Sequence, residues 1–200
     1  MEEKRKEEPE TGIEEKKREL RKAIRERAAA LSLETFQLAG KLIEEQIQNL
    51  PAYANAKVVF CFVSTAHEPE TRGLLQQLFA DGKQVAVPRC GKGGQMDACL
   101  IQSLDELVPG RFGIFAPGET AERIAPEKLD LILLPALSCG LDGNRLGQGG
   151  GFYDRFLPRT KAVRAALCRE AELQEKIPAK KHDCKMDYVI TEHACIRVPV

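Results

Sequence analysis

The chain has 200 residues, 43% of them hydrophobic, and its 30 basic residues balance 30 acidic ones. This length and composition suit one globular domain with its own core and argue against wholesale disorder. A net charge of zero gives no overall field that would draw the chain onto nucleic acid or an anionic membrane, so any anion site must be local. No apolar run reaches the roughly 18 residues that span a bilayer.

The seven cysteines are odd in number, occur singly and form no CxxC pair. This pattern is typical of reduced, mostly buried thiols, and together with a Lys/Glu-rich N-terminus it predicts a soluble, unexported protein of the cytoplasm. The three histidines, His67, His182 and His193, show no metal-ligand spacing, so no structural zinc site is expected.

The N-terminal part of the chain divides into a charged head and two helices. Residues 1–12 are almost entirely charged and predict a disordered extension, which leaves 13–200 as the folded domain. From Ile13 the apolar residues recur at about one-turn spacing and indicate an amphipathic helix. Ser32 is a plausible N-cap for a second helix, which Pro51 is expected to end.

The remainder of the chain alternates between strand and helix patterns. Continuous Val, Ile and Leu runs are typical of strands covered on both faces, and they alternate with helical segments. The pattern predicts an α/β fold, a three-layer α/β/α sandwich with a largely parallel sheet. The expected strands are 58–63, 84–87, 96–101, 129–134, 163–168 and 188–191, and the expected helices between them include 71–80 and 152–157.

A glycine-rich loop follows the apolar run that ends near residue 137. The order strand, loop, helix places this loop at the carboxyl edge of an open sheet, where ligands bind. Its glycines 147, 149, 150 and 151 allow positive φ angles and a close approach of backbone N–H groups to an anion, and Arg145 adds a fixed positive charge. The loop is neither a Walker A motif nor GxGxxG, and a flexible turn is the alternative interpretation.

The run GNRLGQGGGFYDRFL at residues 143–157 resembles the signature loop of the 5-formyltetrahydrofolate cyclo-ligase family. Three more segments resemble the family in the expected order: KRELR at 17–21, EPET at 68–71 and the stretch 183–192. The resemblance covers about residues 16–192. It implies a single domain similar to the NagB/RpiA/CoA-transferase-like fold.

The resemblance also implies the site residues. Those implied to contact ATP are Lys17, Arg18, Glu19, Leu20, Arg21, Arg145, Leu146, Gly147, Gln148, Gly149, Gly150, Gly151, Phe152 and Tyr153. Those implied to contact the folate are Val63, Glu68, Gln148, Gly149, Gly150, Gly151 and Phe152. Asp154 and Asp187 correspond to magnesium ligands, and the implied catalytic residues are Lys17, Arg145 and Tyr153.

On the residues alone, each of these positions also has an ordinary structural interpretation. These are a solvated basic face for Lys17 and Arg21, a first-turn acid for Glu68 and Asp154, a turn residue for Asp187, a core residue for Val63 and a helix anchor for Tyr153. The chain also departs from the family, which usually has Phe and Asp at Cys139 and Gly140 and commonly Tyr at Phe152. These departures concern the shape of the folate side. Cys61 and Cys139 are expected to be inert core thiols.

The family chemistry is the ATP-dependent cyclisation of 5-formyltetrahydrofolate to 5,10-methenyltetrahydrofolate, with release of ADP and phosphate. It implies ATP, Mg²⁺ and a reduced folate as the other ligand. From the balanced charge we expect no nucleic-acid or membrane partner, and we expect a monomer. One alternative is a paralogue of the same fold that binds a nucleotide or phosphate without cyclising folate. Another is a nucleic-acid module using the charged head, although that head is nearly charge-balanced and has no aromatic residue for stacking.

Overall fold

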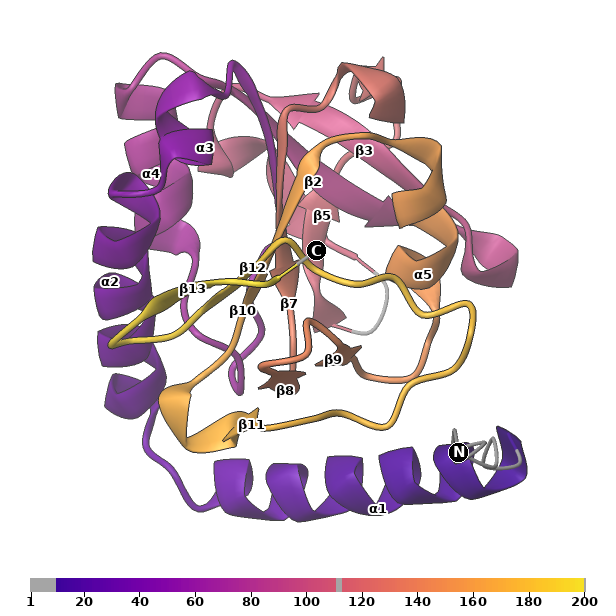
Figure 1. The fold of residues 1–200 in the computed structure, drawn as a ribbon. Coiled ribbons are helices and arrows are strands. Elements are labelled where there is room, and N and C mark those ends of the chain that lie inside the picture. The colour runs from indigo at the N-terminus through magenta and orange to yellow at the C-terminus, as the bar shows by residue number, and fades with distance from the viewer. Residues whose placement is uncertain (1–9, 111–112, 200) are drawn as a thin grey trace.

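The computed structural model describes residues 10–110 and 113–199 (Figure 1). The α-helices are α1 (Glu10–Ala29), α2 (Leu33–Gln48), α3 (Pro51–Asn55), α4 (Arg72–Ala80) and α5 (Phe152–Phe156). Short 3₁₀ turns are η1 (Lys92–Gly94), η2 (Leu104–Glu106), η4 (Pro126–Lys128), η5 (Leu157–Arg159) and η6 (Glu170–Glu172). None of the helices in the described ranges is both long and apolar enough to cross a membrane.

The strands form one large sheet and two small ones. The large sheet contains β1 (Val58–Cys61), β2 (Gln84–Cys90), β3 (Met96–Ile101), β6 (Arg123–Ile124), β7 (Leu131–Pro135), β10 (Val163–Leu167), β12 (Tyr188–Ile190) and β13 (Cys195–Arg197). The small sheets pair β4 (Leu107–Pro109) with β5 (Phe115–Pro117), and β8 (Ser138–Gly140) with β9 (Arg145–Leu146) and β11 (Leu173–Gln174).

The first helix begins earlier than the sequence pattern predicted. Helix α1 starts at Glu10, so residues 10–12 belong to it and not to a disordered extension. In an α-helix each N–H donates to the carbonyl four residues earlier. The N–H groups of residues 14–16 therefore hold residues 10–12 in the helix, although those residues carry no apolar pattern. The rest of the predicted extension, residues 1–9, lies outside the described residues.

The second helix confirms its predicted cap. The Ser32 hydroxyl oxygen accepts a hydrogen bond from the Thr35 N–H at 3.4 Å, which satisfies one donor of the first turn. Pro51 does not end this helix, which already stops at Gln48; it occupies the first turn of α3. Proline suits that position because its missing N–H would have no partner there.

The large sheet is mostly parallel, as predicted. Its strand order is β13-β12-β10-β7-β1-β2-β3-β6, and all pairs from β12 to β2 are parallel. Val59 of β1 lies beside Val85 of β2 and Leu131 of β7, so three buried apolar strands adjoin at the centre. Strands β3, β6 and β13 are antiparallel to their neighbours and close the two edges.

Both faces of the sheet are covered, and side chains of β1 alternate between the two cores. Val59 and Cys61 pack with α2 and α4, whereas Phe60 faces Phe156 of α5 with ring centroids 5.1 Å apart. Figure 1 shows α2, α3 and α4 on one side of the sheet and α5 on the other. The chain is therefore a single-domain mixed α/β fold built around one mostly parallel sheet.

Helix α1 stands apart from both helical layers. It lies along the end of the molecule formed by β8, β9 and β11 (Figure 1). Ile24 of α1 contributes to a small third core with Leu137, Leu146 and Ile177. This packing brings α1 to the glycine loop, which begins in β9.

Candidate functional site

A cavity of about 840 Å³ opens at the carboxyl edge of the parallel strands. Its walls come from α1, the ends of β1, β2 and β7, the β4–β5 hairpin and the glycine loop. Every residue from Arg145 to Asp154 lines it, as do four other predicted site residues: Lys17, Arg21, Val63 and Glu68. The expected position of the glycine loop at this edge is therefore confirmed.

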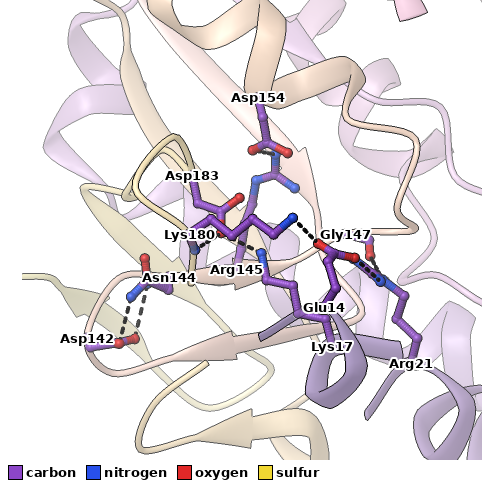
Figure 2. A network of polar contacts seen from close by, with 10 residues as sticks. All are labelled: Glu14, Lys17, Arg21, Asp142, Asn144, Arg145, Gly147, Asp154, Lys180 and Asp183. Atoms are coloured by element: carbon purple, nitrogen blue, oxygen red, sulfur yellow. Dashed lines mark hydrogen bonds and ion pairs between the residues drawn. The ribbon is translucent and has the colours of Figure 1, made fainter. Parts of the chain in front are cut away.

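One face of α1 supplies cations to the cavity. Lys17 is only 5% exposed and forms an ion pair with Asp183, which comes from the C-terminal part of the chain (Figure 2). The Arg21 Nε donates to the Gly147 carbonyl oxygen at 3.0 Å. One turn further on, Arg25 donates to the side-chain oxygen of Gln148 at 2.8 Å. These contacts fasten α1 to the glycine loop.

Three residues that the family resemblance assigned to ATP do not reach this cavity. Arg18 and Glu19 are exposed, and Arg18 pairs with Glu15 on the outer surface of α1. Leu20 packs against the small core around Ile24. The cause is the helical period, because positions 17 and 21 share a face while 18 and 19 are rotated away from it.

The glycine loop uses its conformational freedom at two positions. Gly149 has a φ of 97° and Gly151 a φ of 66°, a region that side chains with a Cβ rarely adopt. The loop is also held from outside by Arg155, whose guanidinium donates to the Gly150 oxygen at 2.7 Å and to the Gly94 oxygen at 3.0 Å. This bridge links the loop to the turn between β2 and β3.

Arg145 is the most deeply buried guanidinium of the cavity. Its side chain is 4% exposed, and its Nη2 donates to Asp154 Oδ1 at 2.9 Å. Its Nε has no hydrogen-bond partner among the described residues. Leaving a buried donor unsatisfied costs free energy of about 1–3 kcal/mol or more for a charged group.

Tyr153, predicted to contact ATP, and Glu68, predicted to contact the folate, both line the cavity. Burial and the nearby Glu68 carboxylate raise the pKa of Tyr153 well above its ordinary value, so its hydroxyl stays protonated and can donate. Glu68 is itself 8% exposed, and its Oε2 accepts from the Thr65 N–H at 2.9 Å and the Thr65 hydroxyl at 3.0 Å. Val63, buried in the core around β1, also lines the cavity.

Of the two predicted magnesium ligands, one lines the cavity. Asp154 lines the cavity, but Asp187 does not, and the Asp187 Oδ2 accepts from the Arg164 N–H at 2.8 Å, near the start of β10. The cavity lies beyond the opposite ends of the parallel strands, so this capping contact holds Asp187 away from it. The second carboxylate from this part of the chain is Asp183, which lines the cavity with Asp154.

Sequence reasoning missed several parts of the cavity. Asp183 lies within the resembling stretch 183–192, so the resemblance could have indicated it. Arg25 continues the face of Lys17 and Arg21 by one turn, which helical periodicity could have indicated. No periodic pattern marked the β4–β5 hairpin, so its contribution, which includes Val108, could not be predicted.

A cation-lined cavity at the carboxyl edge of a mostly parallel sheet defines an α/β protein that binds a phosphate-bearing ligand. The chain belongs to the 5-formyltetrahydrofolate cyclo-ligase family, whose model matches residues 13–192. It is 34% identical to a 5-formyltetrahydrofolate cyclo-ligase of Mus musculus, over 88% of this chain and 93% of that one. It is 30% identical to the enzyme of that name in Escherichia coli K12, over 84% and 96%.

A solved structure has the same fold. The NMR structure of Aquifex aeolicus 5,10-methenyltetrahydrofolate synthetase matches with a TM-score of 0.81 and 28% sequence identity. The match covers 92% of this chain and 93% of that one. The relationship therefore extends over nearly the whole fold, including both α1 and the glycine loop.

Proposed function

We infer that this chain catalyses the ATP-dependent cyclisation of 5-formyltetrahydrofolate to 5,10-methenyltetrahydrofolate, with release of ADP and phosphate. The observation that carries this proposal is that the family match over 13–192 includes the entire glycine loop, every residue of which lines the cavity around Arg145. The buried Arg145 guanidinium, which lines the cavity with Lys17 and Arg21, supports an anionic ligand at this place.

The chemistry explains why ATP is required. The formamide on N5 is a poor electrophile, and its oxygen is a poor leaving group. Transfer of the γ-phosphoryl group to the formyl oxygen gives an iminophosphate, which N10 then attacks at the formyl carbon. N10 loses its proton, phosphate leaves with the former formyl oxygen, and the methenyl bridge remains.

The protein groups of the cavity suit this reaction, because phosphoryl transfer depends mainly on positioning and charge stabilisation. Lys17, Arg21 and Arg145 supply positive charge for the phosphates. The loop 145–154 supplies backbone donors. The protonated Tyr153 hydroxyl can donate to an oxygen of the reacting group. No covalent nucleophile is needed.

The donor set also fits a magnesium ion. Mg²⁺ binds few protein oxygens and completes its shell with water and substrate phosphates, and when bound it neutralises phosphate charge. Asp154 would supply one carboxylate, and Asp183 is the second candidate because it lines the same cavity.

The proposal is tested by absorbance in the methenyl-folate band together with ADP release. Purified protein with Mg-ATP and 5-formyltetrahydrofolate should form product and ADP one for one. Arg145→Gln should lower kcat/KM by roughly 10²-fold to 10³-fold, the usual effect of losing one transition-state donor. Lys22→Gln, on an exposed lysine of α1, is the control. ATP binding without any folate turnover would favour the non-cyclising paralogue instead.

We further propose that the chain works in the cytoplasm as a monomer, without a nucleic-acid or membrane partner. The cysteines support an intracellular location, since among the described residues none of the seven forms a disulfide. We also propose that the fold is similar to the NagB/RpiA/CoA-transferase-like folds. The mostly parallel order of the strands supports this.

A further inference from the structure

Arg89 is a cation of the cavity that the phosphate chemistry does not use. Among the described residues that line the cavity, the other Lys and Arg side chains are Lys17, Arg21 and Arg145, which come from α1 or the start of the glycine loop. Arg89 comes instead from the end of β2, beside β5 of the hairpin (Figure 1). The cavity therefore carries positive charge on two separate walls.

The contacts of Arg89 fix the position of its guanidinium but neutralise its positive charge only weakly. Its Nη1 donates to the Glu119 carbonyl oxygen at 3.0 Å, which fixes the guanidinium. Its Nη2 lies 3.5 Å from the Glu119 carboxylate, but that side chain is 95% exposed, and pairs with such partners are weak. The cross-strand neighbour Asp97 is paired with Arg123 at 3.4 Å.

Part of the cavity wall next to β2 is apolar. Pro109, Ile114 and Pro117 of the β4–β5 hairpin region line the cavity near β2. Rigid apolar surfaces of this kind suit flat aromatic rings. These surfaces would match a ligand that has a group reacting with phosphate at one end, an aromatic ring in the middle and a carboxylate at the other end.

Reduced folates have that form. The formyl group on N5 must meet the γ-phosphate near Lys17 and Arg145, and the aminobenzoyl ring separates this end from the glutamyl tail with its carboxylates. The Arg89 side chain is 23% exposed and needs only to release the Glu119 carboxylate to bind a ligand carboxylate. Guanidinium and carboxylate groups then pair through two parallel hydrogen bonds.

We propose that Arg89 binds a carboxylate of the glutamyl tail of the folate substrate, and that this carboxylate displaces the Glu119 carboxylate from Arg89. This inference rests on the proposed function. It assigns Arg89 to substrate binding and not to the phosphoryl transfer, so its effect belongs to the KM for folate and not to the KM for ATP.

The test crosses substitutions at both residues with two substrates, 5-formyltetrahydrofolate and 5-formyltetrahydropteroate, which lacks the glutamyl tail. Arg89→Gln should raise the KM for the intact folate by roughly 10-fold to 100-fold, the range for a hydrogen bond to a charged group. It should change the KM for the truncated substrate and for ATP less than twofold. Glu119→Gln, which removes the competing carboxylate, should lower the KM for the intact folate only.

Each outcome bears on the proposal. An equal rise in KM for both folates after Arg89→Gln would overturn it, as would a Glu119→Gln variant with unchanged KM for the intact folate. If Arg89→Gln does not fold, the wild-type comparison decides, because a wild-type protein that uses both folates with the same KM has no carboxylate receptor. Failure of the wild-type protein to cyclise any folate would instead count against the proposed function.

Discussion

Lys17 and Asp183 are 166 residues apart in the sequence, yet they form an ion pair inside the cavity. Burial works to raise the pKa of Asp183, but the hydrogen bonds from Lys17 and from the Lys180 N–H outweigh it and hold the pKa below its ordinary value of 3.8. The carboxylate therefore stabilises the folded chain while it is ionised. Its contribution is complete above the ordinary value and is lost as the pH falls through the lowered one.

Asp183→Asn should consequently reduce the free energy of unfolding by an amount that depends on pH. The difference from the wild type should be constant from about pH 7 to pH 5 and should shrink below about pH 3.8, where the wild-type carboxylate also becomes neutral. Urea unfolding across this range measures it. Glu15→Gln removes the same charge at an exposed site of α1 and is the control. A difference that stays constant down to the lowest pH would contradict this role.

At the scale of elements, the helical repeat of α1 places cavity-lining residues on one face and solvent-exposed residues on another. Arg21 lines the cavity and donates to the glycine loop, whereas Arg18 lies on the outer surface. Arg21→Gln should therefore raise the KM for ATP at least about 10-fold, as expected for a lost charged hydrogen bond, and Arg18→Gln less than about twofold. Initial rates at varied ATP give both values. Equal effects of the two substitutions would mean that α1 meets ATP with a different face.

The glycine loop offers a second matched pair. A Cβ at Gly149 would be strained at a φ of 97° and would lie 3.4 Å from the Arg21 guanidinium carbon. Gly149→Ala should cost about 1–2 kcal/mol of unfolding free energy and weaken ATP binding. Gly118 also lines the cavity, but a Cβ there meets nothing within 4 Å. Gly118→Ala should be near neutral in urea unfolding and ATP titration, and a similar loss in both variants would rule out the strain argument.

For the whole molecule, the elements that carry a local sequence pattern could be predicted: the buried strands, the glycine loop and helix α2. The buried strands around Val59 and Leu131 were visible as continuous apolar runs, because strands covered on both faces need no polar residues. The glycine loop was predicted at the carboxyl edge because strand, loop and helix follow one another along the chain. Helix α2 was marked both by its apolar face and by the Ser32 cap.

Other features depend on contacts between distant segments, and no local pattern reports them. The β4–β5 hairpin is short and has little periodicity, so its place in the cavity wall emerges only in the fold. Asp183 and Asp187 are equally acidic in the sequence, and only their contacts in the fold distinguish them: Asp183 pairs with Lys17, whereas Asp187 accepts from the Arg164 N–H. The prediction that Arg18 contacts ATP came from the family resemblance alone. The helical period already indicated that Arg18 lies on a different face of α1 from Lys17 and Arg21.

The central claim is that the cavity activates the formyl oxygen by phosphorylation. The direct measurement uses 5-formyltetrahydrofolate labelled with ¹⁸O in the formyl group, turned over by the wild-type protein with Mg-ATP. Mass spectrometry of the inorganic phosphate should find the label, one ¹⁸O for each methenyl product formed, because the formyl oxygen leaves on phosphorus. Unlabelled phosphate, with the ¹⁸O recovered in water, would contradict the account.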